Sequence, residues 1–343
     1  MKALVLREYN LFVHEEVPTP RRGGDEVLIR VKACAICGSD VHGMDGSSGR
    51  RIPPVIMGHE AAGVIEESGP GVEGFKPGDR VTFDSTIFCG KCYFCRRGQI
   101  NLCDNRRVLG VSCGDYRLDG AFAEFVAVPA HILFPVPDRV TFEQAAMVEP
   151  LSVALHALGR SPAALGDSAV VVGAGMIGLL IIQLLRAAGR GPIIAVDMVD
   201  AKLEMARKFG ADAALRSDRD DVVKETLALT GGRGADAAFE VVGMTPTTQL
   251  ALASVRKGGS ITLVGNIKPM VEAPLQSAVL RQITLHGSCA SAGEYPTCLN
   301  LIASGKVDVD SFISAVAPLS EGASWFKRLY AAEPGLLKVI LKP

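Results

Sequence analysis

The chain has 343 residues, a hydrophobic content of 48%, a charged content of 21% and a formal net charge of −1. This length exceeds what one ordinary hydrophobic core organises, so we expect two domains. The composition is that of a globular protein and not of a disordered one. Because there is no basic excess to neutralise phosphates, nucleic acid is excluded as the main partner.

The first ten residues contain a short apolar run that Arg7 and Glu8 interrupt. The run is too short for the core of a signal peptide and predicts a strand. Nine cysteines without an export signal are expected to be reduced or metal-bound, which favours a cytoplasmic protein. The apolar stretch 169–185 approaches the length of a membrane span, but its three glycines favour a strand that turns into a helix, so we expect no membrane partner.

The first 150 or so residues are predicted to form a β-rich domain. Alternating patterns predict strands over 26–33, 61–67 and 121–128, and residues 76–81 predict a turn that leads into another strand.

From about residue 168 onward, strand and helix patterns alternate, which indicates a doubly wound parallel sheet. The predicted strands lie at 169–172, 193–197, 237–242, 260–264 and 283–286, and the predicted helices at 176–189 and 201–210. A last strand is predicted over 336–342.

Cys89, Cys92, Cys95 and Cys103 have a C-x2-C-x2-C-x7-C spacing. Four thiolates at such spacing are typical of a closed tetrahedral zinc site, in which protein ligands alone hold the metal. A site of this kind stabilises a loop and performs no chemistry.

A second set, Cys37, His59, Glu60 and Glu149, mixes sulfur, imidazole and carboxylate. This mixture is expected where zinc keeps one position open, and zinc there makes a bound alcohol more acidic and thus a better hydride donor. Which of the two carboxylates binds the metal stays open.

Three residues near Cys37 are candidates for supporting roles. The hydroxyl of Ser39 could pass a proton outward and the imidazole of His42 could deliver it to solvent, although a turn residue and a surface histidine are the alternatives. Asp40 is a candidate to orient the histidine ligand.

Residues Gly173, Gly175 and Gly178 match the G-x-G-x-x-G pattern between a predicted buried strand and a predicted helix. In this context the glycines permit a tight turn, close approach to a pyrophosphate and packing of helix on strand. The helix N-terminus adds a partial positive charge for the phosphates.

The next predicted strand ends in Asp197, which would accept hydrogen bonds from the adenosine ribose. Its charge repels a 2′-phosphate, and neither Met198 nor Val199 offers a cation in compensation, so NAD is favoured over NADP. Lys202 lies either along the same ribose edge or on the solvated face of its helix.

The order of these motifs, together with Glu149-Pro150-Leu151-Ser152, resembles the zinc-containing medium-chain alcohol and polyol dehydrogenases over essentially the whole chain, in particular the sorbitol dehydrogenase branch. The resemblance implies an α/β fold with a β-rich GroES-like catalytic domain, residues 1–152 completed by 290–343. It also implies a Rossmann domain with a doubly wound parallel sheet over 153–289, two zinc ions per chain, NAD, and a homodimer or homotetramer.

By the same resemblance, Cys37, His59 and one or both of Glu60 and Glu149 hold the reactive zinc, and Glu60 is counted with the catalytic residues. NAD contacts are implied at Ile177, at Val264, Gly265 and Asn266, and over residues 288–290. The implied reaction is the reversible oxidation of a secondary alcohol, that is a polyol, sugar or sugar acid, to a ketone.

Sorbitol dehydrogenases carry an Arg-Tyr pair where this chain has Ala290 and Ser291, so sorbitol itself is disfavoured. Arg117, Glu294 and Tyr295 could serve another substrate or be structural. L-threonine 3-dehydrogenase, a polyol-phosphate dehydrogenase and a catalytically silent NAD-binding relative are the alternatives.

Overall fold

The structure is a computed structural model that describes residues 1–162 and 164–343. The chain divides into two compact units, one formed by residues 1–149 and 292–343 and the other by residues 150–291. None of the described helices is both long and apolar enough to cross a membrane.

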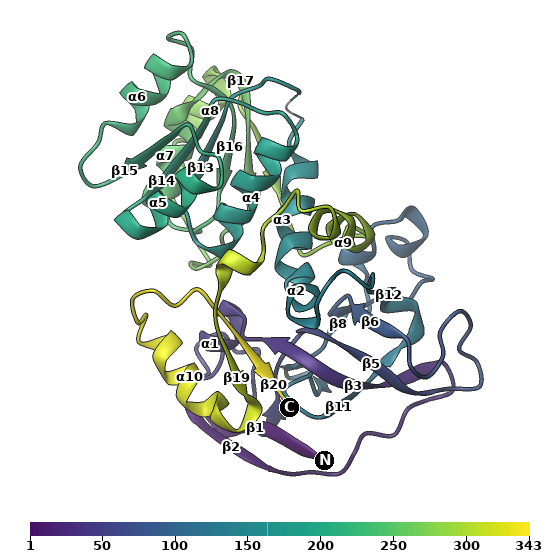
Figure 1. Ribbon diagram of the computed structural model, residues 1–343. Helices are drawn as coiled ribbons and strands as arrows, with labels where there is room; N and C mark the ends of the chain where they lie inside the picture. Colours follow the sequence, from purple (N-terminus) through teal and green to yellow (C-terminus); the bar gives the residue numbers. More distant parts are fainter. Residues whose placement is uncertain (163) are drawn as a thin grey trace. The chain divides into compact units, whose positions relative to one another are not determined.

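The first unit is built on a seven-stranded sheet in the order β12-β6-β5-β3-β20-β19, with β11 also paired to β3. Its strands are β3 (Glu26–Ala35), β5 (Glu60–Ser68), β6 (Arg80–Phe83), β11 (Phe125–Pro129), β12 (Leu133–Pro135), β19 (Ile313–Pro318) and β20 (Lys338–Lys342). Figure 1 shows the last strand of the chain, in yellow, beside the purple β3. The C-terminal segment therefore completes the sheet that the N-terminal segment begins.

Smaller elements surround this sheet. A three-stranded sheet consists of β2 (Leu11–Glu16), β1 (Lys2–Glu8) and β4 (Val55–Ile56). Two-stranded ladders join β7 (Thr86–Ile87) to β8 (Arg107–Val108) and β9 (Val111–Ser112) to β10 (Arg117–Leu118). The helices are α1 (Gly38–Val41), α2 (Phe142–Ala146), α9 (Tyr295–Ala303) and α10 (Gly322–Tyr330), and α3 (Val148–Arg160) starts at the end of this unit and continues into the other. Apolar side chains of both sheets, among them Leu4 and Ile29, form the core with Phe122 and with Phe326 of α10.

The second unit contains six parallel strands in the order β15-β14-β13-β16-β17-β18, which confirms the predicted doubly wound sheet. The strands are β13 (Ala169–Val172), β14 (Ile193–Asp197), β15 (Ala213–Arg216), β16 (Ala235–Glu240), β17 (Val255–Leu263) and β18 (Thr284–Gly287). The helices between them are α4 (Met176–Ala187), α5 (Asp200–Lys208), α6 (Val222–Leu229), α7 (Thr245–Ser254) and α8 (Leu275–Leu280). Val170 and Ile194 of the sheet pack with Leu252 of α7 and Ala278 of α8 on one face.

Several predicted strands differ from the observed ones in their limits, such as that over 260–264, which is β17 from Val255 to Leu263, and for two others the hydrogen bonds give the reason. The strand predicted over 121–128 begins only at Phe125, because the backbone of Phe122 bonds to Leu4 and Met57 instead of joining the ladder. The strand predicted over 237–242 lies at Ala235–Glu240, since the Glu240 carboxylate accepts hydrogen bonds from the backbone N–H groups of Val242 and Gly243 and turns the chain there.

Candidate functional site

The four cysteines of the 89–103 loop lie together, with their sulfur atoms all within 4.8 Å of one another. Cys95 starts a short 3₁₀ turn, and the backbone N–H groups of Cys89 and Asn105 each point at the sulfur of Cys103 from 3.3 Å. Tetrahedral zinc with Zn–S bonds of about 2.3 Å places its sulfurs roughly 3.8 Å apart. The donor set and its spacing therefore fit a closed zinc site.

The thiols of this loop do not ionise independently. A hydrogen bond from the backbone N–H of Lys91 lowers the pKa of Cys89 to about 6. Burial and the neighbouring Cys92 thiol instead raise the pKa of Cys95 to about 12. Crowded thiolates repel one another, so a cation is needed before all four lose their protons.

The second cluster gathers Cys37, His59 and Glu60, whose donor atoms also lie within 4.8 Å of one another. Cys37 caps the N-terminus of α1, and His59 and Glu60 stand at the start of β5. Gly58 comes immediately before them at φ +95°, and a Cβ there would meet Cys34 and Phe122 within 2.9 Å. Glycine is therefore required at position 58, where the backbone packs directly against Cys34 and Phe122 just before His59.

Asp40 orients the ring of His59 from the side of Nδ1. One carboxylate oxygen lies 3.4 Å from His59 Nδ1, and the other accepts a 2.9 Å hydrogen bond from the buried guanidinium of Arg51. Burial opposes a charged imidazole, but Asp40 and Cys37 outweigh it and raise the pKa of His59. The other ring nitrogen, Nε2, lies 3.5 Å from the Ser39 hydroxyl and is left for a ligand. Sequence reasoning missed Arg51, a charged residue that precedes the Ile52-Pro53-Pro54 turn.

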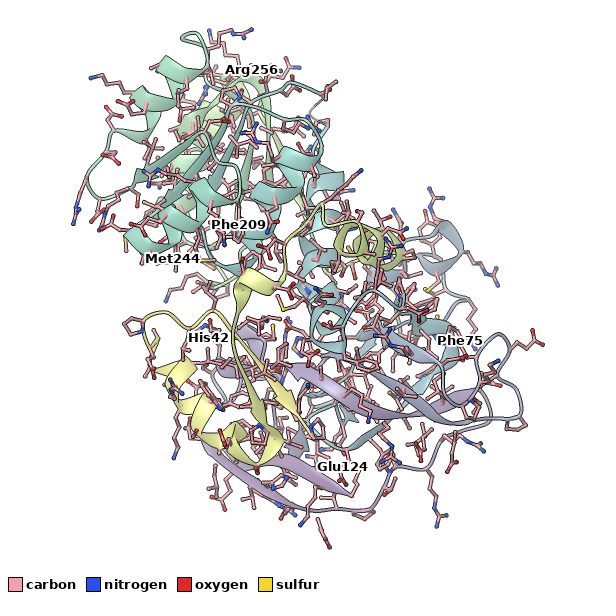
Figure 2. The ribbon with its side chains drawn as sticks, in the orientation of Figure 1. His42, Phe75, Glu124, Phe209, Met244 and Arg256 are labelled. Carbon is pink, nitrogen blue, oxygen red and sulfur yellow. The ribbon has the colours of Figure 1, made fainter. Side chains whose placement is uncertain are left out.

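Ser39 and His42 lie on the exposed side of this cluster. The Ser39 hydroxyl is 3.3 Å from the Cys37 sulfur, beside the donor atoms. His42 is exposed at the C-terminal end of α1, where Figure 2 labels it. The two residues therefore run from the donor cluster towards solvent.

Glu149 is not within the 4.8 Å group that Cys37, His59 and Glu60 form. Its carboxyl group is nevertheless near enough to be influenced by theirs. Burial raises the pKa of Glu149 to about 7 against the lowering effect of the His59 charge, and the Glu60 charge adds a smaller rise. Its role as a metal ligand stays a prediction.

Lys338 is the main residue of this site that sequence reasoning missed. Its ammonium donates to both Glu60 oxygens, at 2.7 and 3.0 Å, and to the Ile36 carbonyl at 3.2 Å. The side chains of Lys338 and Glu60 are only 4% and 1% exposed. Burial alone would lower the pKa of Lys338, but the Glu60 carboxylate outweighs burial and raises it, so the ammonium group stays charged. The available signal was a lysine with apolar residues on both sides of it in the last predicted strand.

The glycine motif of the second unit forms the turn from β13 into α4. Gly173 has φ +105°, and a Cβ on Gly178 would lie 1.9 Å from the Gly173 carbonyl oxygen. A Cβ on Gly175, at the N-cap of α4, would meet nothing within 4 Å. Gly173 and Gly178 are thus needed for packing, whereas Gly175 leaves the helix N-terminus open to a pyrophosphate. Ile177, the other predicted contact in this turn, lies in the first turn of α4.

Asp197 ends β14 and bonds to that turn. One carboxylate oxygen accepts from Ala174 N–H at 2.8 Å, and the other accepts from the N–H groups of Met198 and Val199 at 2.8 and 3.0 Å. Lys202 Nζ is 3.9 Å from the same carboxylate. The predicted ribose partner and the predicted phosphate turn are therefore adjacent.

Val264, Gly265 and Asn266 follow β17 at the same edge of the sheet. The N–H groups of Val264 and Gly265 donate to the Glu240 carbonyl, and a Cβ on Gly265 would lie 2.2 Å from the backbone of Gly243. This close backbone approach puts the segment next to the end of β16. The predicted contact segment 288–290 follows β18 at that edge.

The structure also gives the surroundings of the residues that the sequence analysis considered for substrate binding. Arg117 is exposed on β10, and Ser291 is buried after Ala290. Tyr295 is fully buried and stacks on Phe134 with ring centroids 4.8 Å apart. Its hydroxyl has no hydrogen-bond partner among the described residues, and Glu294 bonds to the N–H of Ala292.

Two family models match the chain: the alcohol dehydrogenase GroES-like domain over residues 23–138 and the zinc-binding dehydrogenase model over residues 177–304. The chain therefore belongs to the zinc-binding medium-chain dehydrogenases, as the motifs predicted. It is an oxidoreductase that acts on the CH–OH group of a small alcohol, with zinc and a nicotinamide cofactor.

The chain is 34% identical to sorbitol dehydrogenase of Bacillus subtilis, with 100% of this chain and 97% of that protein covered. It is 37% identical to L-threonine 3-dehydrogenase of Pyrococcus horikoshii, with 87% and 86% covered. Among solved structures it resembles a putative zinc-binding dehydrogenase from Sinorhizobium meliloti 1021 bound to NADP, with a TM-score of 0.90, 31% identity and 100% and 99% covered.

The four-cysteine site is expected to contribute stability and no chemistry. Replacing Cys95 with Ser should remove one zinc per chain and lower Tm by on the order of 5–10 °C, because the metal ties the loop together only in the folded state. Zinc content and thermal unfolding measure this, and Cys113→Ser is the control. A variant that keeps the parent Tm but loses turnover would contradict the assignment.

The Lys338–Glu60 pair is expected to behave as a buried ion pair. In metal-free protein, Lys338→Met should lower the free energy of unfolding by about 3–5 kcal/mol, since it leaves the Glu60 carboxylate buried without its cation. The double variant Glu60→Gln/Lys338→Met should recover most of that loss. Denaturant unfolding of all three proteins tests the expectation, and a single variant as stable as the parent would refute it.

Proposed function

We propose that this protein oxidises a secondary alcohol, namely a polyol, sugar or sugar acid, to the ketone with NAD, in a reversible reaction. One zinc is held by Cys37, His59 and a carboxylate of Glu60 or Glu149, and a second by the four cysteines. The predicted catalytic domain, residues 1–152 and 290–343, carries the alcohol site, and the predicted Rossmann domain, residues 153–289, carries NAD.

The difference between the two donor clusters supports this proposal most strongly. The 89–103 loop supplies four sulfurs, which fill a tetrahedral site. The other cluster supplies three mixed donors, with exposed Ser39 and His42 beside them. A zinc ion held by Cys37, His59 and one carboxylate would keep a position for a substrate oxygen, and as a Lewis acid it would lower the pKa of the alcohol hydroxyl.

Side chains of the protein itself transfer the proton and orient the metal ligand. Ser39, close to Cys37 and His59, receives the hydroxyl proton and passes it outward, and exposed His42 releases it to solvent. Asp40 holds the His59 ring so that Nε2 faces the ligand side. Bound NAD would supply the hydride acceptor, which would take the hydrogen and two electrons from the alcohol carbon and leave the ketone.

NAD is favoured over NADP by the surroundings of Asp197. Its carboxylate is fixed by three backbone N–H groups at the end of β14, where the adenosine ribose hydroxyls would donate to it. A 2′-phosphate at this point would meet a like charge. The homo-oligomer and the cytoplasmic location remain predictions.

L-threonine 3-dehydrogenase activity is the second candidate, and the relative of that name at 37% identity favours it. This substrate carries a carboxylate and an ammonium group, so it requires a binding pocket of different charge from that for a neutral polyol.

Purified protein should reduce NAD with at least one member of a panel of polyols, aldoses, sugar acids, polyol phosphates and L-threonine, measured as NADH absorbance. Prior chelation should abolish turnover, and added zinc should restore it. The pattern over the panel identifies the substrate class. Turnover that survives complete removal of zinc would refute the proposal.

Ser39→Ala should lower kcat by about 10²–10⁴-fold, since it removes a proton carrier next to the reacting oxygen. Zinc content and the Kd for NADH should stay at the parent values. Ser39→Thr keeps the hydroxyl and is the matched control, expected to retain most of the turnover. Full activity in the alanine variant would exclude the relay.

A further inference from the structure

An arginine lies beside the predicted ribose partner at the cofactor edge of the second unit. Arg216 ends β15 and stands opposite Asp197 of β14 in the ladder. The next residue, Ser217, donates its N–H to the Asp197 carbonyl at 3.2 Å. The backbone of Arg216 is therefore fixed one strand away from the carboxylate that would bind the adenosine ribose.

An arginine at this point would ordinarily favour NADP. The extra 2′-phosphate of NADP is a dianion, and a guanidinium binds phosphate through paired hydrogen bonds. The fold itself accepts NADP, since the similar protein from Sinorhizobium meliloti was solved with NADP bound. The preference of this chain for NAD or NADP therefore depends on whether its own Arg216 is available to bind the 2′-phosphate.

The guanidinium of Arg216 is already engaged by two carboxylates. Its Nη1 donates to Asp200 at 2.8 Å, and its Nε and Nη2 donate to the two oxygens of Asp218 at 2.9 and 2.8 Å. Only 17% of the Arg216 side chain is exposed. Both hydrogen-bonding edges that could accept a phosphate are thus occupied by carboxylates of the same unit.

We propose that Asp200 and Asp218 are specificity-determining residues that keep Arg216 away from the 2′-phosphate and so reinforce the rejection of NADP by Asp197. The inference rests on the proposed use of NAD. Two layers of discrimination follow: Asp197 repels the phosphate, and the cation that would attract it is neutralised.

Stability is a weak explanation for the Arg216 pairs. The side chains of Asp200 and Asp218 are 64% and 43% exposed, and ion pairs at such positions contribute little to folding. Removal of the two carboxylates should therefore leave the unit folded. This makes their effect on cofactor affinity measurable by itself.

The test is a set of variants read by the Kd for NADPH and NADH from cofactor fluorescence. Asp197→Ser should tighten NADPH binding, partly because it also frees Lys202, which lies 3.9 Å from Asp197. Adding Asp200→Ser and Asp218→Ser should tighten it by a further factor of about 10–100, the range expected for new charge-assisted hydrogen bonds. Introducing Arg216→Gln into that triple variant should cancel the further gain.

Two controls separate this effect from others. Glu204→Gln/Glu225→Gln removes the same charge from exposed positions on α5 and α6 and should leave NADPH affinity near the parent value. Arg216→Gln alone should also leave it unchanged, because Arg216 is engaged in the parent.

A gain in the triple variant that survives Arg216→Gln, or an equal gain in the glutamine control, would overturn the inference. Weaker NADPH binding in the single Arg216→Gln variant would overturn it too. Tighter binding of NADPH than of NADH by the parent would instead contradict the proposed use of NAD, so the two failures are distinguishable.

Discussion

The buried ion pair between Lys338 and Glu60 is the interaction on which the arrangement of the first unit depends. Lys338 comes from β20, Glu60 from the start of β5, and the Ile36 carbonyl that Lys338 also contacts immediately precedes Cys37. One ammonium group thus ties together the two segments that carry the reactive donors. Because an unpaired charge at this depth is costly, neither segment is free to move without the other.

Charges are also paired in the rest of the donor cluster. Asp40 is buried between Arg51 and His59, so its negative charge is balanced on both sides. Cys37 adds a sulfur donor and Glu60 a carboxylate oxygen beside the His59 ring. This mixture of donors suits a metal cation, and the four crowded thiols of the 89–103 loop need a cation before they all lose their protons.

In the second unit, close contacts between backbone segments exclude any side chain at two glycines. The carbonyl of Gly173 leaves no room for a Cβ at Gly178, and the backbone of Gly243 leaves none at Gly265. These contacts bring the ends of β13, β14, β16 and β17 to one edge of the sheet. We propose that charged side chains at that edge, Asp197 and Arg216 with its two aspartates, set the cofactor preference.

The sequence by itself predicted those features that form between residues close together in the chain. Four cysteines within fifteen positions come together through local turns, and the G-x-G-x-x-G turn needs only its own strand and helix. The sequence of strand and helix patterns also predicted the fold class, because each pattern reflects which face of its element is buried. The wrong strand limit near Phe125 arose where the backbone bonds to distant segments instead of to a neighbouring strand.

Only the tertiary structure decided which charges meet. Lys338 and Glu60 are 278 positions apart, and no local pattern connects them. Glu149, which the sequence grouped with the metal ligands, lies outside the group that Cys37, His59 and Glu60 form, although the charges of His59 and Glu60 shift its pKa. Local periodicity records how each element is buried, whereas the partner of a buried charge is fixed by how distant strands pair, and that pairing is set by the fold as a whole.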